Sequence, residues 1–232
     1  MESFNPFEMW HNMGILARIV VILLVGMSIY SIWVMIDRFA VFSKTRKTSL
    51  AFVLGLRDRL LKRDLAGALT LSKTEPQAPI ARVVQEALSE YEEGVQAIHG
   101  KAAEDIGDFD VVDAVNRAID RVKEREVANF KKGLGGLASI SSAAPFIGLF
   151  GTVVGIINAF RSMAASGQGG LGAVSAGISE ALFTTAVGLL VAIPAVMSFN
   201  YFTNTIESFV VDMNDVSSEL ISYVLREERD RA

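Results

Sequence analysis

The stretch GISEALFTTAVGLLVAIPAV, residues 177–196, decides the fold class of this chain. It carries one ionisable side chain, that of Glu180, followed by the hydroxyls of Thr184 and Thr185. Glu180 is also the only charged residue in the longer run from Gly172 to Tyr201. About 20 predominantly apolar residues are enough for a helix to cross the hydrocarbon core of a bilayer. The run is therefore predicted to be a transmembrane helix.

Two further uncharged runs lie upstream. One is IVVILLVGMSIYSIWVMI, residues 19–36, and the other lies between Lys132 and Arg161. Each is long enough to cross a membrane. No basic region precedes the first run, so we expect a retained span and not a cleaved signal peptide. The fold class predicted is an all-α membrane protein with three transmembrane helices, two of them extended into a cytoplasmic helical bundle.

These runs divide the chain into seven segments. The three spans separate a short N-terminal interfacial helix, a large helical domain, a short outer loop and a C-terminal helix. In chain order the predicted segments are 1–15 (interfacial helix), 16–37 (first span), 38–132 (helical domain), 133–160 (second span), 161–172 (outer loop), 173–201 (third span) and 202–232 (C-terminal helix).

Lysine and arginine flank the spans unevenly. The first fifteen residues carry neither, and the link between the second and third spans carries only Arg161. Basic residues cluster instead at both ends of the 38–132 segment and in the C-terminal tail. Cytoplasmic loops are enriched in basic residues. We therefore expect a periplasmic N-terminus, with the 38–132 segment and the C-terminus in the cytoplasm.

The polar segments contain amphipathic helical patterns. Apolar residues recur at helical spacing within 83–91, from Asp110 onward, and again within 206–225. Two prolines in SKTEPQAPIA indicate a turn between helices. The helix that starts near Asp110 is expected to continue into the second span, and the third span is expected to continue into the C-terminal helix. The apolar stripe of 206–225 is interpreted as packing against the other cytoplasmic helices, with a coiled-coil contact between subunits as the alternative.

Composition excludes several kinds of chemistry. The chain has no cysteine, which rules out disulfides, thiolate catalysis and cysteine-bound metals. Its two histidines, His11 and His99, are far apart in sequence. The net charge of -4 does not suggest a nucleic-acid partner. No metal, no cofactor and no enzymatic activity are expected.

Glu180 is the most informative single residue. It lies roughly 10 Å along the third span, where an ionised carboxylate is costly unless it is paired, hydrated or protonated. One interpretation is an interfacial residue that reaches outward to water, and the other is part of a proton pathway. On a helical wheel Thr184 lies about 40° from Glu180 and Thr185 about 140° from it. Thr152, in the second span, is a further polar candidate, although a membrane threonine commonly bonds its own helix.

Glycine and proline residues punctuate the second and third spans. Pro145 and Pro194 fall inside them, which membrane helices tolerate. Gly151 and Gly155 form a GxxxG pair that favours close helix packing. A GxGxxG pattern occurs within residues 167–172, but it lies between two spans and lacks the strand that a dinucleotide site requires. It is interpreted as an outer loop.

Two segments resemble a known family. APFIGLFGTVVGIINAF, residues 144–160, and GISEALFTTAVGLLVAIPAVMSFNYF, residues 177–202, are similar to the signature segments of the MotA/TolQ/ExbB proton-channel family. The arrangement of one span, a large cytoplasmic segment and two further spans resembles its ExbB/TolQ branch. The resemblance implies that Thr152, Glu180 and Thr185 line a proton pathway. Thr184, which the helical wheel favours, is kept as a secondary candidate.

The resemblance also implies an assembly. It predicts a ring-forming homo-oligomer, a pentamer, around a dimer of a single-span ExbD/TolR-like partner that supplies the proton-accepting aspartate. The complex would use the proton-motive force at the bacterial inner membrane to drive TonB-dependent import, Tol-type envelope maintenance or gliding motility through a TonB/TolA-like or motility component. The alternative is a non-conducting scaffold that only holds a partner.

Overall fold

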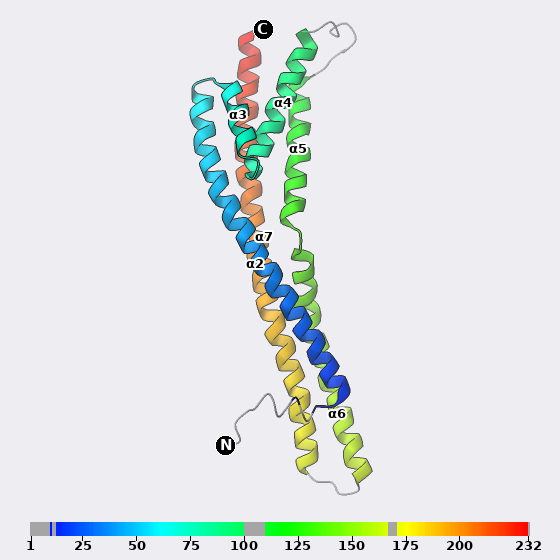
Figure 1. The fold of residues 1–232 in the computed structure, drawn as a ribbon. Coiled ribbons are helices and arrows are strands. Elements are labelled where there is room, and N and C mark those ends of the chain that lie inside the picture. Colours follow the sequence, from blue (N-terminus) through cyan, green and yellow to red (C-terminus); the bar gives the residue numbers. More distant parts are fainter. Residues whose placement is uncertain (1–9, 11–12, 100–109, 167–170, 232) are drawn as a thin grey trace. The chain divides into compact units, whose positions relative to one another are not determined.

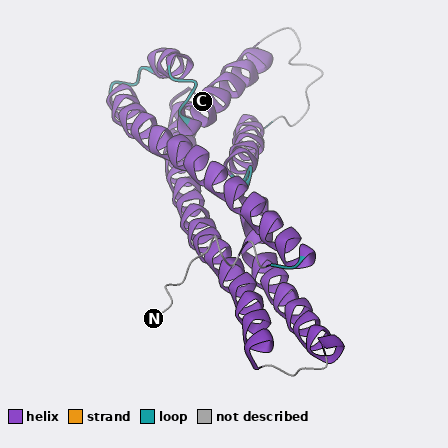
Figure 2. Cartoon of the chain, turned by 60° about the horizontal axis from the view of Figure 1, so that its bottom comes forward, coloured by secondary structure: helices purple, strands orange, loops and turns teal. Residues whose placement is uncertain are grey.

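The computed structural model describes residues 10, 13–99, 110–166 and 171–231. Figure 2 shows that these residues form helices joined by short loops, and the described part of the chain contains no strand. The predicted all-α class is confirmed. Most of the predicted interfacial helix at 1–15 lies outside the described residues, as do Gly167 and Gly169 of the proposed outer loop.

The described helices range from one short connector to one of more than sixty residues. They are α2 (Ile15–Leu61), α3 (Leu65–Thr74), α4 (Pro79–His99), α5 (Val111–Phe130), α6 (Leu134–Ser166) and α7 (Leu171–Arg231) (Figure 1). Helices α6 and α7 continue through Pro145 and Pro194, which lie inside them. Three helices are long and apolar enough to cross a membrane: α2, α6 and α7.

The chain forms two compact units. The membrane unit consists of residues 1–37 and 133–202, and the bundle unit of residues 38–132 and 203–232. Helices α2 and α7 each contribute residues to both units, so these are the two spans that extend into the bundle. The sequence prediction of an extended third span is confirmed, whereas the continuous extension of the second span is not.

The bundle unit has an apolar core that the amphipathic patterns predicted. In α4 the predicted face is buried at Val83, Val84, Ala87, Leu88 and Tyr91. Within the bundle unit α4 packs against α5 and α3 packs against α4. The C-terminal part of α7 adds a buried stripe at Ile206, Phe209, Met213, Val216, Leu220 and Val224. This stripe packs within the unit, and the prediction fails only at Leu225, which is 49% exposed.

Side chains and turns define the helix ends of the bundle unit. The carboxylate of Asp64 accepts a hydrogen bond from the Gly67 N–H at 2.8 Å and so caps the start of α3. At the end of α2 the N–H of Asp64 donates to the Arg59 carbonyl and that of Arg63 to the Leu60 carbonyl. This pattern is a Schellman motif, which places Arg63 in the left-handed region at φ 55°. Glycine is the usual residue at that position.

A glycine separates α5 from α6. The sequence predicts one helix from Asp110 into the second span, but α5 ends at Phe130 and α6 begins at Leu134. Gly133 has φ 81°, a left-handed conformation that a right-handed helix cannot contain. A Cβ at Gly133 would also lie 3.1 Å from Val34 Cγ1 of α2. The prediction of a continuous rod is therefore wrong.

The membrane unit exposes large apolar side chains on all three of its helices. Trp33 of α2 is 64% exposed, Phe146 of α6 is 71% exposed and Leu190 of α7 is 72% exposed. A water-soluble protein does not maintain such surfaces over three adjoining helices. They require lipid or apolar protein partners around the unit.

Candidate functional site

The candidate site lies in a close contact between α6 and α7. Small residues face each other along both helices, so that side chains added at the glycines would collide. A Cβ at Gly188 would lie 2.7 Å from the Ala144 carbonyl oxygen, and one at Gly148 would lie 2.8 Å from that of Thr184. One at Gly155 would lie 2.9 Å from Ala181 Cβ. Backbones this close bring polar groups of both helices within hydrogen-bonding reach.

Three threonine side chains meet in this contact, and we call them the threonine cluster: Thr152 of α6, and Thr184 and Thr185 of α7. The Thr152 hydroxyl donates to the Ala181 carbonyl at 2.8 Å and is hydrogen-bonded to the Thr185 hydroxyl. The Thr184 hydroxyl lies 2.7 Å from the Ala181 carbonyl oxygen and 3.1 Å from that of Gly148 across the interface, and it can donate to either one. Thr152 and Thr184 are buried, and Thr185 is half-buried.

One arrangement of hydroxyl protons satisfies the whole cluster. Each threonine has one proton to donate and two acceptor positions. If Thr185 donates to Thr152, Thr152 to the Ala181 carbonyl and Thr184 to the Gly148 carbonyl, each carbonyl accepts one hydroxyl proton in addition to the N–H of its own helix. The oxygen of half-buried Thr185 then keeps acceptor capacity for water or for a partner's side chain. The cluster is a short chain of rotatable hydroxyls that ends at a partly accessible oxygen.

Glu180 lies one helical turn before Thr184 in α7, and it contacts α2. Its Oε1 accepts a hydrogen bond from the Gly14 N–H at 2.8 Å. The Gly14 carbonyl accepts from the Arg18 N–H at 3.1 Å, so Gly14 is the capping residue at the start of α2. A carboxylate at a helix N-terminus is stabilised by the unpaired N–H groups and by the positive end of the helix dipole. The Glu180 side chain is half-buried.

The start of α2 is held against α7 beside this carboxylate. Met13, Ala17 and Val21 form a small buried cluster with the partly buried ring of Phe183. Farther along α2, Val20 Cγ1 would lie 3.2 Å from a Cβ placed at Gly151 of α6. All three helices of the membrane unit therefore contribute to the surroundings of Glu180 and the threonine cluster.

The structure brings together only some of the residues that the sequence singled out. Thr152 and both α7 threonines are in direct contact. Among the described residues no hydrogen bond joins Glu180 to any of them, and its carboxylate accepts instead from the Gly14 N–H. Gly151 and Gly155 lie in the α6–α7 contact as the GxxxG pair predicts, and the helices continue through Pro145 and Pro194.

Sequence reasoning missed the backbone part of the site. The Ala181 and Gly148 carbonyls and the Gly14 N–H complete the hydrogen bonds, and no side chain marks them in a sequence. Gly188 was also missed, although the four-residue spacing of Thr184 and Gly188 would place both on one face of α7. Helical spacing placed Thr184 and Thr185 on different faces of α7, yet the Thr152 hydroxyl contacts the hydroxyls of both.

The chemistry available is polar and largely uncharged. From residue 134 to residue 202 the sequence contains one carboxylate, that of Glu180. In the described part of the chain no three histidine, aspartate or glutamate side chains are grouped so that they could hold a metal ion. Hydroxyls and carbonyls can solvate or pass a proton, but a chain of them needs an acid or base at its end.

Comparison with known proteins identifies the family. The model of the MotA/TolQ/ExbB proton channel family matches residues 75–215. The chain is 32% identical to the biopolymer transport protein ExbB of Neisseria meningitidis over 203 residues, 87% of this chain and 88% of that protein. It is 43% identical to the Tol-Pal system protein TolQ of Pseudomonas aeruginosa over 100 residues, 43% of each chain.

A further ExbB, from Pseudomonas putida, is 41% identical over 109 residues, which are 47% of this chain and 33% of that protein. The family is one of transport proteins and not of enzymes, and its members ExbB and TolQ match the predicted branch. Three apolar helices and these relatives make the chain a multi-pass inner-membrane protein. The chain belongs to the MotA/TolQ/ExbB proton channel family.

Proposed function

We propose that this chain is a proton-conducting stator subunit that couples the proton-motive force to motion of a single-span ExbD/TolR-like partner. The observation that carries the proposal is the threonine cluster between α6 and α7, with Glu180 one turn away. Membership of a proton-channel family supports it. The motion would energise TonB-dependent import, Tol-type envelope maintenance or gliding motility.

The division of labour follows from the side chains present. Threonine hydroxyls stay neutral at neutral pH, so they solvate and orient a proton but do not store its charge. The partner's intramembrane aspartate would act as the proton carrier beside Thr185. Glu180 would keep the outer entrance hydrated and attractive to cations. One charge that crosses 100 mV releases about 2.3 kcal/mol, which is the energy available per proton for each step of the partner.

The proposal includes an orientation and an assembly. The distribution of lysine and arginine supports a periplasmic N-terminus and a cytoplasmic C-terminus. The exposed apolar side chains of the membrane unit give enough surface for neighbouring copies and lipid. We propose a pentameric ring around a partner dimer. Native mass spectrometry of the mildly solubilised complex should then give five copies, and a stable monomer or dimer would argue against the ring.

Glu180→Gln tests the conducting role. The glutamine retains an oxygen that can accept from the Gly14 N–H, so the contact with α2 survives while the charge is lost. We expect the complex to co-purify with its partner, and proton flux into proteoliposomes under an imposed potential to fall strongly. Glu207→Gln, at an exposed position farther along the same helix, is the matched control and should leave the flux unchanged.

The same experiment distinguishes the stator from a scaffold. A scaffold predicts that Glu180→Gln assembles with the partner and supports undiminished partner-driven output. If assembly and output both match those of the unmodified protein, the conducting function proposed for this chain is wrong.

A further inference from the structure

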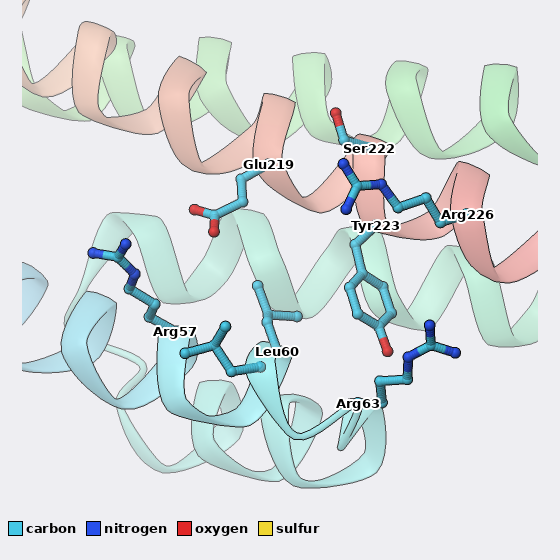
Figure 3. Close-up of a pocket in the computed structure, with 8 residues that line it drawn as sticks. Arg57, Leu60, Arg63, Glu219, Ser222, Tyr223 and Arg226 are labelled. Carbon is cyan, nitrogen blue, oxygen red and sulfur yellow. The ribbon is translucent and has the colours of Figure 1, made fainter.

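A pocket of about 360 Å³ lies in the bundle unit, between the end of α2 and the C-terminal part of α7 (Figure 3). This volume falls within the range of small-molecule sites. The proposed proton pathway uses none of the residues that line the pocket.

The pocket is locally positive. Arg57, Arg63 and Arg226 line it together with one carboxylate, that of Glu219, so three positive groups and one negative give a net charge of +2. The chain as a whole carries -4. In the part of the chain that the structure describes, no carboxylate lies within the 4.0 Å ion-pair distance of Arg57 or Arg226. Two guanidinium groups of the pocket are thus left with their hydrogen-bond donors available.

The backbone at Arg63 gives a second, independent observation. Arg63 occupies the left-handed position of the Schellman motif, at φ 55°. Glycine adopts this conformation without steric cost, whereas any residue with a Cβ is disfavoured in it. Folding alone would therefore favour glycine at position 63. An arginine stands there instead, and its side chain lines the pocket.

The remaining lining is largely apolar. Leu60 belongs to the last turn of α2, and Figure 3 shows Tyr223 pointing from α7 toward the end of α2 and Arg63. Ser222 adds a hydroxyl on the α7 side. Guanidinium groups form paired, charge-assisted hydrogen bonds with phosphate oxygens, and an aromatic ring beside them can pack on a flat or apolar group.

We propose that this pocket binds the phosphate group of a small ligand that also has an apolar or planar part. The phosphate contacts the guanidinium groups of Arg57, Arg63 and Arg226, and the rest of the ligand packs on Tyr223 and Leu60. Two sources supply this chemistry, a soluble organic phosphate such as a nucleotide and the headgroup of an anionic phospholipid.

Titration calorimetry on the full-length protein in detergent tests the proposal. The probes are ADP, inorganic pyrophosphate, adenosine and short-chain phosphatidylglycerol, each measured at low and at physiological salt. We expect at least one phosphate-bearing probe to bind, more weakly as salt rises, and adenosine not to bind. Binding of ADP or pyrophosphate assigns a soluble phosphate ligand, and binding of phosphatidylglycerol alone assigns a lipid headgroup.

Variants connect the binding to this pocket. Arg57→Gln and Arg226→Gln should each weaken binding at least about tenfold, since each removes a charged hydrogen-bond donor. Arg125→Gln is the matched control, because Arg125 is an exposed arginine of the same unit that does not line the pocket. Arg63→Gly should weaken binding while the protein melts at an equal or higher temperature, which separates recognition from folding. The proposal is overturned if no phosphate-bearing probe binds, or if the pocket variants bind as tightly as the control.

Discussion

Thr152 is the residue on which the candidate site depends most. Its hydroxyl contacts the Ala181 carbonyl, the Thr185 hydroxyl and, at 3.5 Å, the Thr184 hydroxyl. It also lies 3.4 Å from the carbonyl of Gly148 on its own helix. The interpretation of a threonine that bonds only its own helix is therefore incomplete, because the shorter contact crosses to α7.

Replacement of Thr152 by valine should separate conduction from stability. Hydrogen bonds between membrane helices contribute about 0.6 kcal/mol on average, so Thr152→Val should melt close to the unmodified protein. Proton flux should fall at least about tenfold, which corresponds to about 1.4 kcal/mol in the barrier, because Thr185 loses its partner. Flux in proteoliposomes and thermal unfolding in detergent measure the two effects.

Two further variants control this result. Thr152→Ser restores a hydroxyl and should recover most of the flux. Ser139→Ala removes a hydroxyl of α6 that bonds only the Gly135 carbonyl of its own helix, and it should change neither quantity. Equal flux in Thr152→Val and Ser139→Ala would remove Thr152 from the pathway.

The side chains of the candidate site could be predicted from the sequence, but their partners could not. A carboxylate and three threonines stand out in uncharged runs because polar groups are costly there. Their roles as donors and acceptors depend on which backbone groups of α2, α6 and α7 lie opposite. Helical periodicity assigns a face within one helix, and it contains no information on the neighbouring helix.

At the scale of the element, the contact between α6 and α7 depends on glycine. Gly148 and Gly188 are both buried, and each faces backbone of the other helix. Replacement of either by alanine would force the helices apart, because the added methyl carbon would lie only 2.7 Å (Gly188) or 2.8 Å (Gly148) from a carbonyl oxygen of the other helix. The threonine cluster would separate with them.

Gly148→Ala and Gly188→Ala should therefore each destabilise the membrane unit by about 1–3 kcal/mol, the usual cost of overpacking. Gly135→Ala, in the same helix α6, is the control, because nothing lies within 4 Å of the Cβ it would add. Thermal unfolding of the detergent-solubilised protein measures the difference. A Gly148→Ala variant as stable as Gly135→Ala would contradict the close contact.

The cap of α3 should make the bundle unit sensitive to acid. The hydrogen bond from the Gly67 N–H, assisted by Arg59, lowers the pKa of Asp64 below its ordinary value of 3.8. A lowered folded-state pKa contributes stability that is present above the unfolded value and lost as the pH falls through the folded value. Asp64→Asn should therefore melt below the unmodified protein at pH 6, and the gap should narrow toward pH 3.

Melting curves of both proteins between pH 6 and pH 3 test this. Asp58→Asn is a suitable control, since Asp58 forms only an exposed ion pair with Lys62 and such pairs contribute little. It should have a smaller effect at pH 6 than Asp64→Asn. A gap for Asp64→Asn that stays constant with pH would exclude the charged cap as its cause.

At the scale of the whole molecule, the spans and the continuation of the third span were predictable, whereas the lengths of α2 and α5 were not. Apolar runs identify spans because a bilayer demands them. Beyond Asp37, however, α2 continues with a buried stripe in which Thr45 and Ser49 alternate with Phe42 and Phe52. Because Thr45 and Ser49 are polar, the apolar residues of this segment do not show a helical period in the sequence. At Gly133 the predicted helix was too long. The side-chain pattern continues past this residue, but its left-handed backbone ends the helix.

The proposed orientation can be tested directly, because the chain contains no cysteine. Ser162→Cys and Lys73→Cys each introduce one thiol at an exposed position, in α6 and α3 respectively. A membrane-impermeant maleimide added to spheroplasts should label Ser162→Cys, and it should label Lys73→Cys only after permeabilisation. The reverse pattern would invert the topology.

The discontinuity of the bundle unit has a consequence for how the protein is made. Residues 38–132 leave the ribosome long before residues 203–232, yet Met213, Leu220 and Val224 of the later segment are fully buried in the shared core. Until α7 is synthesised, the earlier helices have no partner for that apolar face. The core of the bundle unit can be completed only after the third span, which precedes residues 203–232, has been synthesised and inserted into the membrane. A folded bundle unit therefore indicates that membrane insertion is complete. A nascent chain that stalls before this point exposes apolar surface, which is the signal that quality-control proteases and chaperones recognise.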